Sequence, residues 1–118
     1  MSEVRVNWFE IPVRDMDRAV SFYQTVLGFP LGTMDGPSGP MNIFPGADGA
    51  AGALTSGDTE PGQGGVLVYL YCDDIDAALE RAAGAGGSVV QPKTSIGPFG
   101  HIGSLIDTEG NRVSLHTP

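Results

Sequence analysis

Glu10 has the clearest capacity for chemistry among the residues of this sequence. It lies in a segment whose side chains alternate between two faces of a predicted strand, and its face is opposite that of Phe9 and Ile11. A carboxylate that faces a cleft can act as a general base or as the counter-charge for a cationic ligand. The alternatives are an ion pair with Arg112 or a solvated position at the mouth of the cleft.

Three aromatic residues share the predicted face of Glu10. Trp8 precedes it by two positions, and Tyr69 and Tyr71 occupy a similar strand in the second half of the chain. Their rings can stack on a planar ligand or receive a cation on the ring face. The alternative is that they fill an ordinary core.

Two histidines supply the other candidate donor atoms. His101 begins a predicted strand, and His116 lies on the last predicted strand. With Glu10 they contain the donor types of a divalent metal site, although their spacing matches no known motif. The alternative is that both are solvated or structural. No Ser/His/Asp or Cys/His nucleophile arrangement can be assembled, and Cys72 is expected beneath a helix.

The elements that position these residues occur twice along the chain. In each half, a strand is followed by an amphipathic helix that begins after an aspartate cap, Asp15 or Asp74. The two caps are 59 residues apart, half of the 118-residue length, which indicates a tandem duplication. Short apolar runs after each helix predict three more strands per half. We therefore expect one domain with a first module at 1–56, a linker at 57–65 and a second module at 66–118.

The predicted fold class is α+β, with two tandem βαβββ modules that form a curled mixed sheet around a cleft and helices outside. A single helix covers only one face of each module's sheet, so the open faces are expected to share the cleft. One set of strand residues should pack beneath the helices: Phe9, Ile11, Val13, Val68, Leu70, Cys72, Val113 and Leu115. Their alternates should face the cleft: Trp8, Glu10, Ala53, Thr55, Leu67, Tyr69, Tyr71, Arg112, Ser114 and His116.

The charge of the chain restricts its partners. Its formal net charge is −8 and its pI is about 4.3, which disfavours nucleic acid and anionic membranes as partners and suits a small organic ligand, cationic or neutral. The alternative is that the acidity only keeps the protein soluble. The single cysteine excludes an intramolecular disulfide, and no apolar run is long enough to span a membrane. The first residues show no signal-peptide pattern, so we expect a cytoplasmic protein.

The tandem arrangement, the segment "PVRDMDRAVSFYQTVLGF" and the segment "IDTEGNRVSL" resemble the vicinal oxygen chelate superfamily of glyoxalases, bleomycin resistance proteins and extradiol dioxygenases. The resemblance covers essentially the whole chain. It implies a cleft in which the family's metalloenzymes hold a divalent metal with residues from the first and last strands of each half. The corresponding positions here are Trp8, Thr55, Leu67 and Ser114. Trp and Leu lack a donor atom and the hydroxyls are weak neutral ligands, so we expect no metal and no other cofactor.

Three functions remain open from the sequence. The first is a small-molecule-binding member of the superfamily that lacks the usual metal site, with ligand or antibiotic sequestration as one form. The second is a glyoxalase-like lyase, isomerase or dioxygenase-like enzyme with a relocated metal or with Glu10 as general base. The third is a non-catalytic interaction module. The resemblance also implies a homodimer, because a second copy commonly covers the cleft and the sheet edges.

Overall fold

The computed structural model describes residues 2–37, 39–47, 49–57 and 59–118. Asp58, which belongs to the predicted linker, lies outside the described residues. The first module contains four strands and one helix: β1 (Phe9–Pro12), α1 (Met16–Leu27), β2 (Gly32–Gly36), β3 (Gly39–Gly46) and β4 (Gly49–Thr55).

The second module repeats this order with one short insertion. Its elements are β5 (Tyr69–Tyr71), α2 (Ile75–Gly84), β6 (Ser88–Ser95), the 3-10 turn η1 (Gly97–Phe99), β7 (His101–Ile106) and β8 (Arg112–Thr117). The strand orders are β1-β4-β3-β2 and β5-β8-β7-β6, so the two modules share one topology. In each sheet the first strand runs parallel to the last, and the other pairs are antiparallel. The predicted α+β class and the two βαβββ modules are confirmed.

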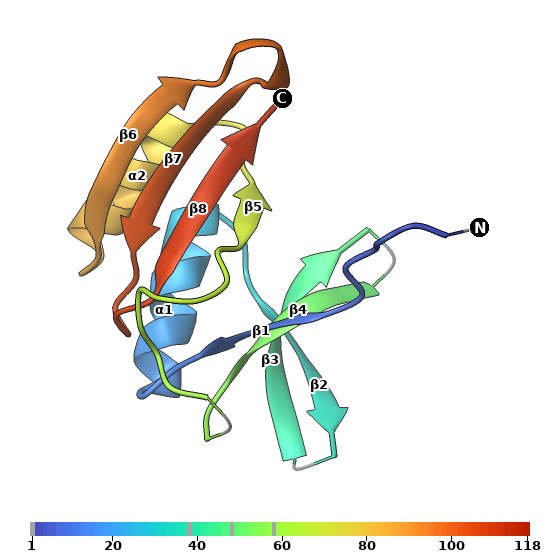
Figure 1. Ribbon diagram of the computed structural model, residues 1–118. Coiled ribbons are helices and arrows are strands. Elements are labelled where there is room, and N and C mark those ends of the chain that lie inside the picture. The colour runs from blue at the N-terminus through green and yellow to red at the C-terminus, as the bar shows by residue number, and fades with distance from the viewer. Residues whose placement is uncertain (1, 38, 48, 58) are drawn as a thin grey trace.

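The two sheets stay separate in the described part of the chain. Each contains four strands, and no strand pairing joins one sheet to the other. Figure 1 shows the two sheets as distinct units, with α2 behind the second sheet and α1 near the centre of the molecule. The inner edges, β1 and β5, each pair with a strand on one side only. In the described part of the chain, the two sheets therefore do not join into one continuous sheet or close into a barrel.

The first strand of each module is shorter than the alternation predicts. Pairing of β1 with β4 begins at Phe9, and residues before it, including Val4 and Val6, are exposed. Alternation in the sequence indicates which face of a strand a side chain lies on. It does not indicate where the hydrogen-bonded pairing with a neighbouring strand begins and ends. The strands themselves cover only four residues in β1 and three in β5.

The helices begin where the sequence indicates. The side chain of Asp15 accepts from the amide of Arg18, and the side chain of Asp74 accepts from the amide of Ala77. Each aspartate thus satisfies an amide that has no partner inside its helix. At the other end of α1, Gly28 adopts φ +83°, a left-handed conformation that glycine tolerates without a Cβ clash.

One hydrophobic core extends through both modules. Its buried members come from both helices and both sheets: Ile11, Val13, Ala19, Phe22, Tyr23, Val26, Phe44, Leu54, Ile75, Ala78, Leu79, Ala82, Leu105, Val113 and Leu115. The helices pack against each other, and Arg81 of α2 donates to the Thr25 and Val26 carbonyls at the end of α1. A Cβ on Gly87 would lie 2.8 Å from the Phe22 ring, so this glycine permits a close contact between modules. Cys72 is only half-buried against the core.

A buried polar network fixes the second module against the first. We call Asp107, Glu109 and Asn111, from the turn between β7 and β8, the polar junction; all three are buried. The sequence predicts this segment as a hairpin turn, which is confirmed by the left-handed Gly110 at φ +92°. Its side chains, however, reach across to the first module. The junction therefore has a role that a turn pattern does not predict.

Glu109 makes the densest set of contacts in the polar junction. Its carboxylate accepts from the backbone amides of Arg14 and Asp15, both at 2.8 Å, and from the guanidinium of Arg18 at 2.8 and 3.1 Å. These donors, with the Arg18 guanidinium first, lower the pKa of Glu109 from 4.5 to about 2, although burial opposes this. The carboxylate therefore remains charged at neutral pH.

Asp107 and Asn111 complete the junction. Asp107 accepts from the Tyr23 hydroxyl at 2.6 Å, and burial followed by this carboxylate raises the pKa of Tyr23 well above its ordinary value. Asn111 donates to the Pro12 carbonyl at 2.7 Å and accepts from the Gly62 amide at 3.0 Å. The junction thus connects the end of β1, the linker and the start of β8.

Among the described residues, no helix is long and apolar enough to cross a membrane.

Candidate ligand-binding site

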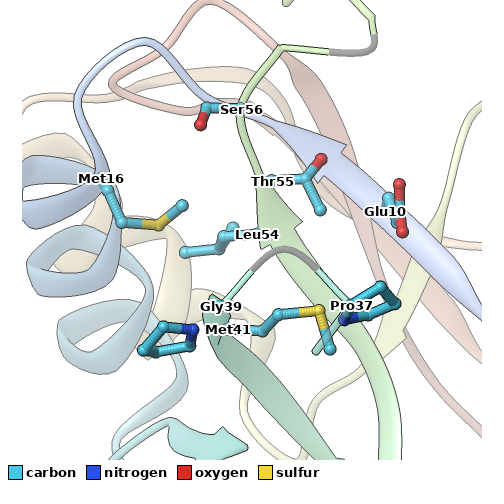
Figure 2. A pocket seen from close by; sticks show the side chains of 9 residues that line it. Glu10, Met16, Pro37, Gly39, Met41, Leu54, Thr55 and Ser56 are labelled. Carbon is cyan, nitrogen blue, oxygen red and sulfur yellow. The ribbon is translucent and has the colours of Figure 1, made fainter. Parts of the chain in front are cut away.

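The larger hollow described in the structure lies in the first module, between the beginning of α1, the end of β4 and the turn joining β2 to β3. Its volume is about 450 Å³, within the range that encloses drug-sized molecules. Figure 2 shows Met16 extending from α1 towards Leu54 of β4, while Met41 and Pro37 line the side formed by the β2–β3 hairpin. Glu10, Gly39, Pro40, Thr55 and Ser56 complete the lining. We call this hollow the methionine pocket.

The methionine pocket combines an adaptable apolar wall with a few polar groups. Thioether side chains are flexible and polarizable, so Met16 and Met41 can adjust to different ligand shapes. The carboxylate of Glu10 and the hydroxyl of Thr55 supply polar groups at the sheet. A pocket of this kind suits an organic molecule with an apolar body and a polar or cationic substituent.

Glu10 is held beside the single tryptophan of the chain. The indole Nε1 of Trp8 donates to Oε2 of Glu10 at 3.1 Å. Trp8 is 37% exposed, and Glu10 is also exposed. The carboxylate therefore has one fixed donor and free accepting capacity, as binding of a ligand cation requires.

Glu10 also lines a second, smaller hollow. It has a volume of about 110 Å³ and lies between the linker, the end of β1 and the start of β8. Its polar lining comes from Glu10, Glu60, Asn111 and Arg112. Within the described ranges, Arg112 forms no ion pair, so the predicted alternative of a Glu10–Arg112 pair is not observed. We call this hollow the arginine pocket.

The remaining predicted ligand residues lie on the second sheet or just before it, whereas Glu10 and Thr55 belong to the first sheet. Tyr69 and Tyr71 are 51% and 66% exposed on the edge strand β5, opposite Ser114 and His116 of β8. The Tyr71 hydroxyl donates to Asp73. Hydroxyls of Ser104 and Ser114 are hydrogen-bonded at 2.7 Å and buried. Leu67 is half-buried just before β5 begins.

The internal offset of 59 does not hold on the last strands. Glu10 lies opposite Ala53, and Tyr69 lies opposite Ser114. The first members differ by 59 (69 minus 10), whereas their partners differ by 61 (114 minus 53). Register therefore makes Ala53 the counterpart of Ser114, and Thr55 the counterpart of His116. A constant offset of 59 would predict Thr55 as the counterpart of Ser114, and the register corrects this prediction by two residues. Strand register depends on hydrogen bonding and not on equal spacing in the chain.

The residues at the four metal positions implied by the family do not fit a divalent metal. Trp8 and Leu67 have no donor atom suited to the ion, and the Ser114 hydroxyl is already paired with Ser104. If Ala53, the register counterpart of Ser114, is taken as the fourth position in place of Thr55, it offers only a methyl group. Over the described ranges, no group of three His, Cys, Asp or Glu side chains is placed to hold a metal.

The alternative metal site at Glu10, His101 and His116 is not assembled in this structure. His116 of β8 lies opposite Ile102 of β7, so these two side chains share one face of the sheet. His101 precedes Ile102 on β7, and its side chain therefore lies on the other face. His116 Nε2 lies 2.7 Å from the Phe99 carbonyl oxygen, and Glu10 belongs to the other sheet.

Several pocket residues are not predicted as site residues from the sequence. Met16 fits the apolar pattern of the helix, which predicts that it packs on the sheet. The other lining residues belong to a hairpin that the sequence predicts only as strand and turn: Pro37, Gly39, Pro40 and Met41. The one available signal is the Gly/Pro-rich "DGPSGP", which marks a turn near the strand that carries Met41. Periodicity does not indicate that this turn lies next to the start of α1.

Comparison with known proteins agrees with this architecture. Residues 5–115 match the model of the Glyoxalase/Bleomycin resistance protein/Dioxygenase superfamily, and the chain belongs to that family. The predicted resemblance to the vicinal oxygen chelate superfamily is thereby confirmed.

Individual relatives include a protein described as antibiotic-binding. The crystal structure of TnmS3, an antibiotic binding protein from Streptomyces sp. CB03234, is 30% identical with a TM-score of 0.66, covering 100% of this chain and 98% of that one. A glyoxalase/bleomycin resistance protein from the same organism is 29% identical with a TM-score of 0.65, covering 93% of this chain and 97% of that one. CFP32 of Mycobacterium bovis is 31% identical over 116 residues, which are 94% of this chain. The alignment spans only 43% of CFP32.

Proposed function

We propose that this protein binds a small organic ligand, with a cationic group favoured, and holds it without a protein-bound metal. The observation that carries the proposal is the position of Glu10, which lines both the methionine pocket and the arginine pocket. A carboxylate beside an apolar, methionine-lined hollow matches a ligand with a hydrophobic body and a cationic substituent. The likeness to TnmS3 supports antibiotic sequestration as one form of this function.

The absence of a resident metal is part of the proposal. It is supported by the donor-poor set at Trp8, Thr55, Leu67 and Ser114. Glu10 then acts as a counter-charge, and its neighbour Trp8 offers a ring face for the same cation.

A homodimer that completes the site is the second part of the proposal. Tyr69, Tyr71 and His116 lie on a different sheet from Glu10, and the sheet edges β1 and β5 lack a second neighbour in the described chain. A second copy that brought its β5 face towards the β1 face of the first would cover these edges and bring the two groups of residues together. We also propose that the protein is cytoplasmic.

A thermal-shift screen with a matched metal series tests the function. Only a ligand that binds the native state preferentially raises the unfolding temperature. We expect stabilisation by aromatic or apolar ammonium compounds and none by Zn²⁺, Ni²⁺, Fe²⁺ or Mn²⁺. Elemental analysis of the dialysed protein should find less than stoichiometric metal. Stabilisation by a metal with equimolar content would instead support a lyase or isomerase.

A further inference from the structure

We infer that the arginine pocket is a carboxylate subsite, so that the ligand is an amphoteric organic molecule with its carboxylate at Arg112 and its cation at Glu10. This inference rests on the proposed function and specifies the chemical class of its ligand. Its starting point is an orphaned donor. The Nε of Arg112 is buried and has no hydrogen-bond partner in the structure.

An orphaned guanidinium donor in a folded protein requires an explanation. Burying an N–H without a partner carries the full desolvation penalty of that donor, so most buried donors are paired. The Nε of arginine and its neighbouring terminal nitrogen form a planar fork that matches the two oxygens of a carboxylate. Arg112 lines a hollow of about 110 Å³, which has room for one such group and not for a whole ligand.

In the described structure, neither acidic residue of the arginine pocket forms an ion pair with Arg112. Glu60 is at the rim with its side chain 91% exposed, and it lies 3.9 Å from the guanidinium of Arg14. Glu10 accepts the Trp8 indole N–H instead. One unpaired positive group and one partly satisfied negative group therefore line the same hollow, an arrangement complementary to a ligand that carries both charges.

The floor of the arginine pocket is held in place by the polar junction. Asn111, the residue before Arg112, is fixed by bonds to Pro12, Asp107 and Gly62. The start of β8 is thus anchored to β1 and the linker before any ligand arrives. Such preorganisation lowers the entropic cost of binding a small group.

The test uses benzoate as the anionic probe and benzamide as its neutral match. Nitrogen-15 NMR of the full chain resolves arginine Nε–H signals, and Arg112→Gln assigns the relevant one. We expect benzoate, but not benzamide, to shift the Arg112 Nε–H signal and to bind about tenfold more weakly to Arg112→Gln. Arg5→Gln, which removes an exposed arginine elsewhere, should bind benzoate as the wild type does. Dispersed amide spectra establish that each variant is folded.

Three results would overturn the inference. The first is equal benzoate affinity for the wild type and Arg112→Gln, and the second is an unchanged Arg112 Nε–H signal at saturation. The third is movement of that signal in ligand-free Glu10→Gln, because Arg112 would then already be paired with Glu10. Binding of benzylammonium distinguishes failure of the carboxylate subsite from failure of the proposed function. Its binding depends on Glu10, and we expect it to be retained in Arg112→Gln.

Discussion

The Trp8 indole donates to the Glu10 carboxylate across 3.1 Å, which places the single tryptophan of the chain beside a residue that lines both hollows. Trp8 is 37% exposed, so its emission should respond to an arriving ligand. We predict that benzylammonium changes the intensity or wavelength of Trp8 fluorescence with the same midpoint as its calorimetric binding curve. Calorimetric binding without any change at Trp8 would place the ligand elsewhere.

Tyr23 should contribute strongly to stability through the polar junction. Its hydroxyl donates to buried Asp107 at 2.6 Å, so Tyr23→Phe leaves that carboxylate with one donor fewer. We expect a loss of roughly 1–3 kcal/mol in the free energy of unfolding, measured by urea denaturation. Tyr71→Phe is the matched control, because the Tyr71 hydroxyl also donates to an aspartate but its side chain is 66% exposed. A similar loss in both variants would argue against a special role for the junction.

The lowered pKa of Glu109 predicts that the free energy of unfolding depends on pH in the acid range. The Arg18 guanidinium and neighbouring amides hold the pKa of Glu109 at about 2 in the folded state, below its ordinary 4.5. The folded state therefore binds this proton less readily than the unfolded state does. Its contribution is present above pH 4.5 and is lost as the pH falls from about 4.5 to 2.

The measurement compares the wild type with Glu109→Gln across this range. We expect the variant to be less stable at pH 7 by roughly 3 kcal/mol and the difference to shrink below pH 4.5. Glu80→Gln, which neutralises an exposed carboxylate on α2, should stay within about 0.5 kcal/mol of the wild type at pH 7. A difference for Glu109→Gln that stayed constant down to pH 2 would refute the assignment.

The oligomeric state is a separate prediction. The chain has a mass of 12.2 kDa, and light scattering at micromolar concentration should report about twice this mass because a second copy can cover β1 and β5. Tyr69→Lys places a charge on the exposed face of β5 and should shift the population towards monomer. A monomeric wild type at that concentration would contradict the dimer.

The sequence predicts local structure well because the relevant signals are local. Asp15 and Asp74 mark the helix starts, Gly28 marks the end of α1, and the repeated pattern predicts two modules. Alternation also identifies Ile11, Val113 and Leu115 as buried. Each of these properties depends on a few neighbouring residues.

The site is predicted less completely, because it depends on contacts between distant segments. Glu10 and Thr55 do line a hollow, but the Met16–Met41 wall arises where a hairpin turn meets the start of a helix. The reach of Glu109 across 91 to 95 positions to Arg18 and Arg14 has no periodic signature either. A constant offset of 59 along the chain predicts Thr55 as the counterpart of Ser114, whereas the observed strand register makes it Ala53, two residues earlier.

Titration calorimetry of benzylammonium and neutral benzyl alcohol against the wild type, Glu10→Gln and Glu80→Gln tests the central claim most directly. Glu10→Gln keeps the shape of the side chain and removes its charge, while Glu80→Gln removes the same charge from an exposed position on α2. We predict that Glu10→Gln weakens benzylammonium about tenfold, or about 1.4 kcal/mol, with benzyl alcohol unchanged and Glu80→Gln indistinguishable from the wild type. Equal losses for both ligands, or no loss in Glu10→Gln, would contradict a charge-selective site at Glu10.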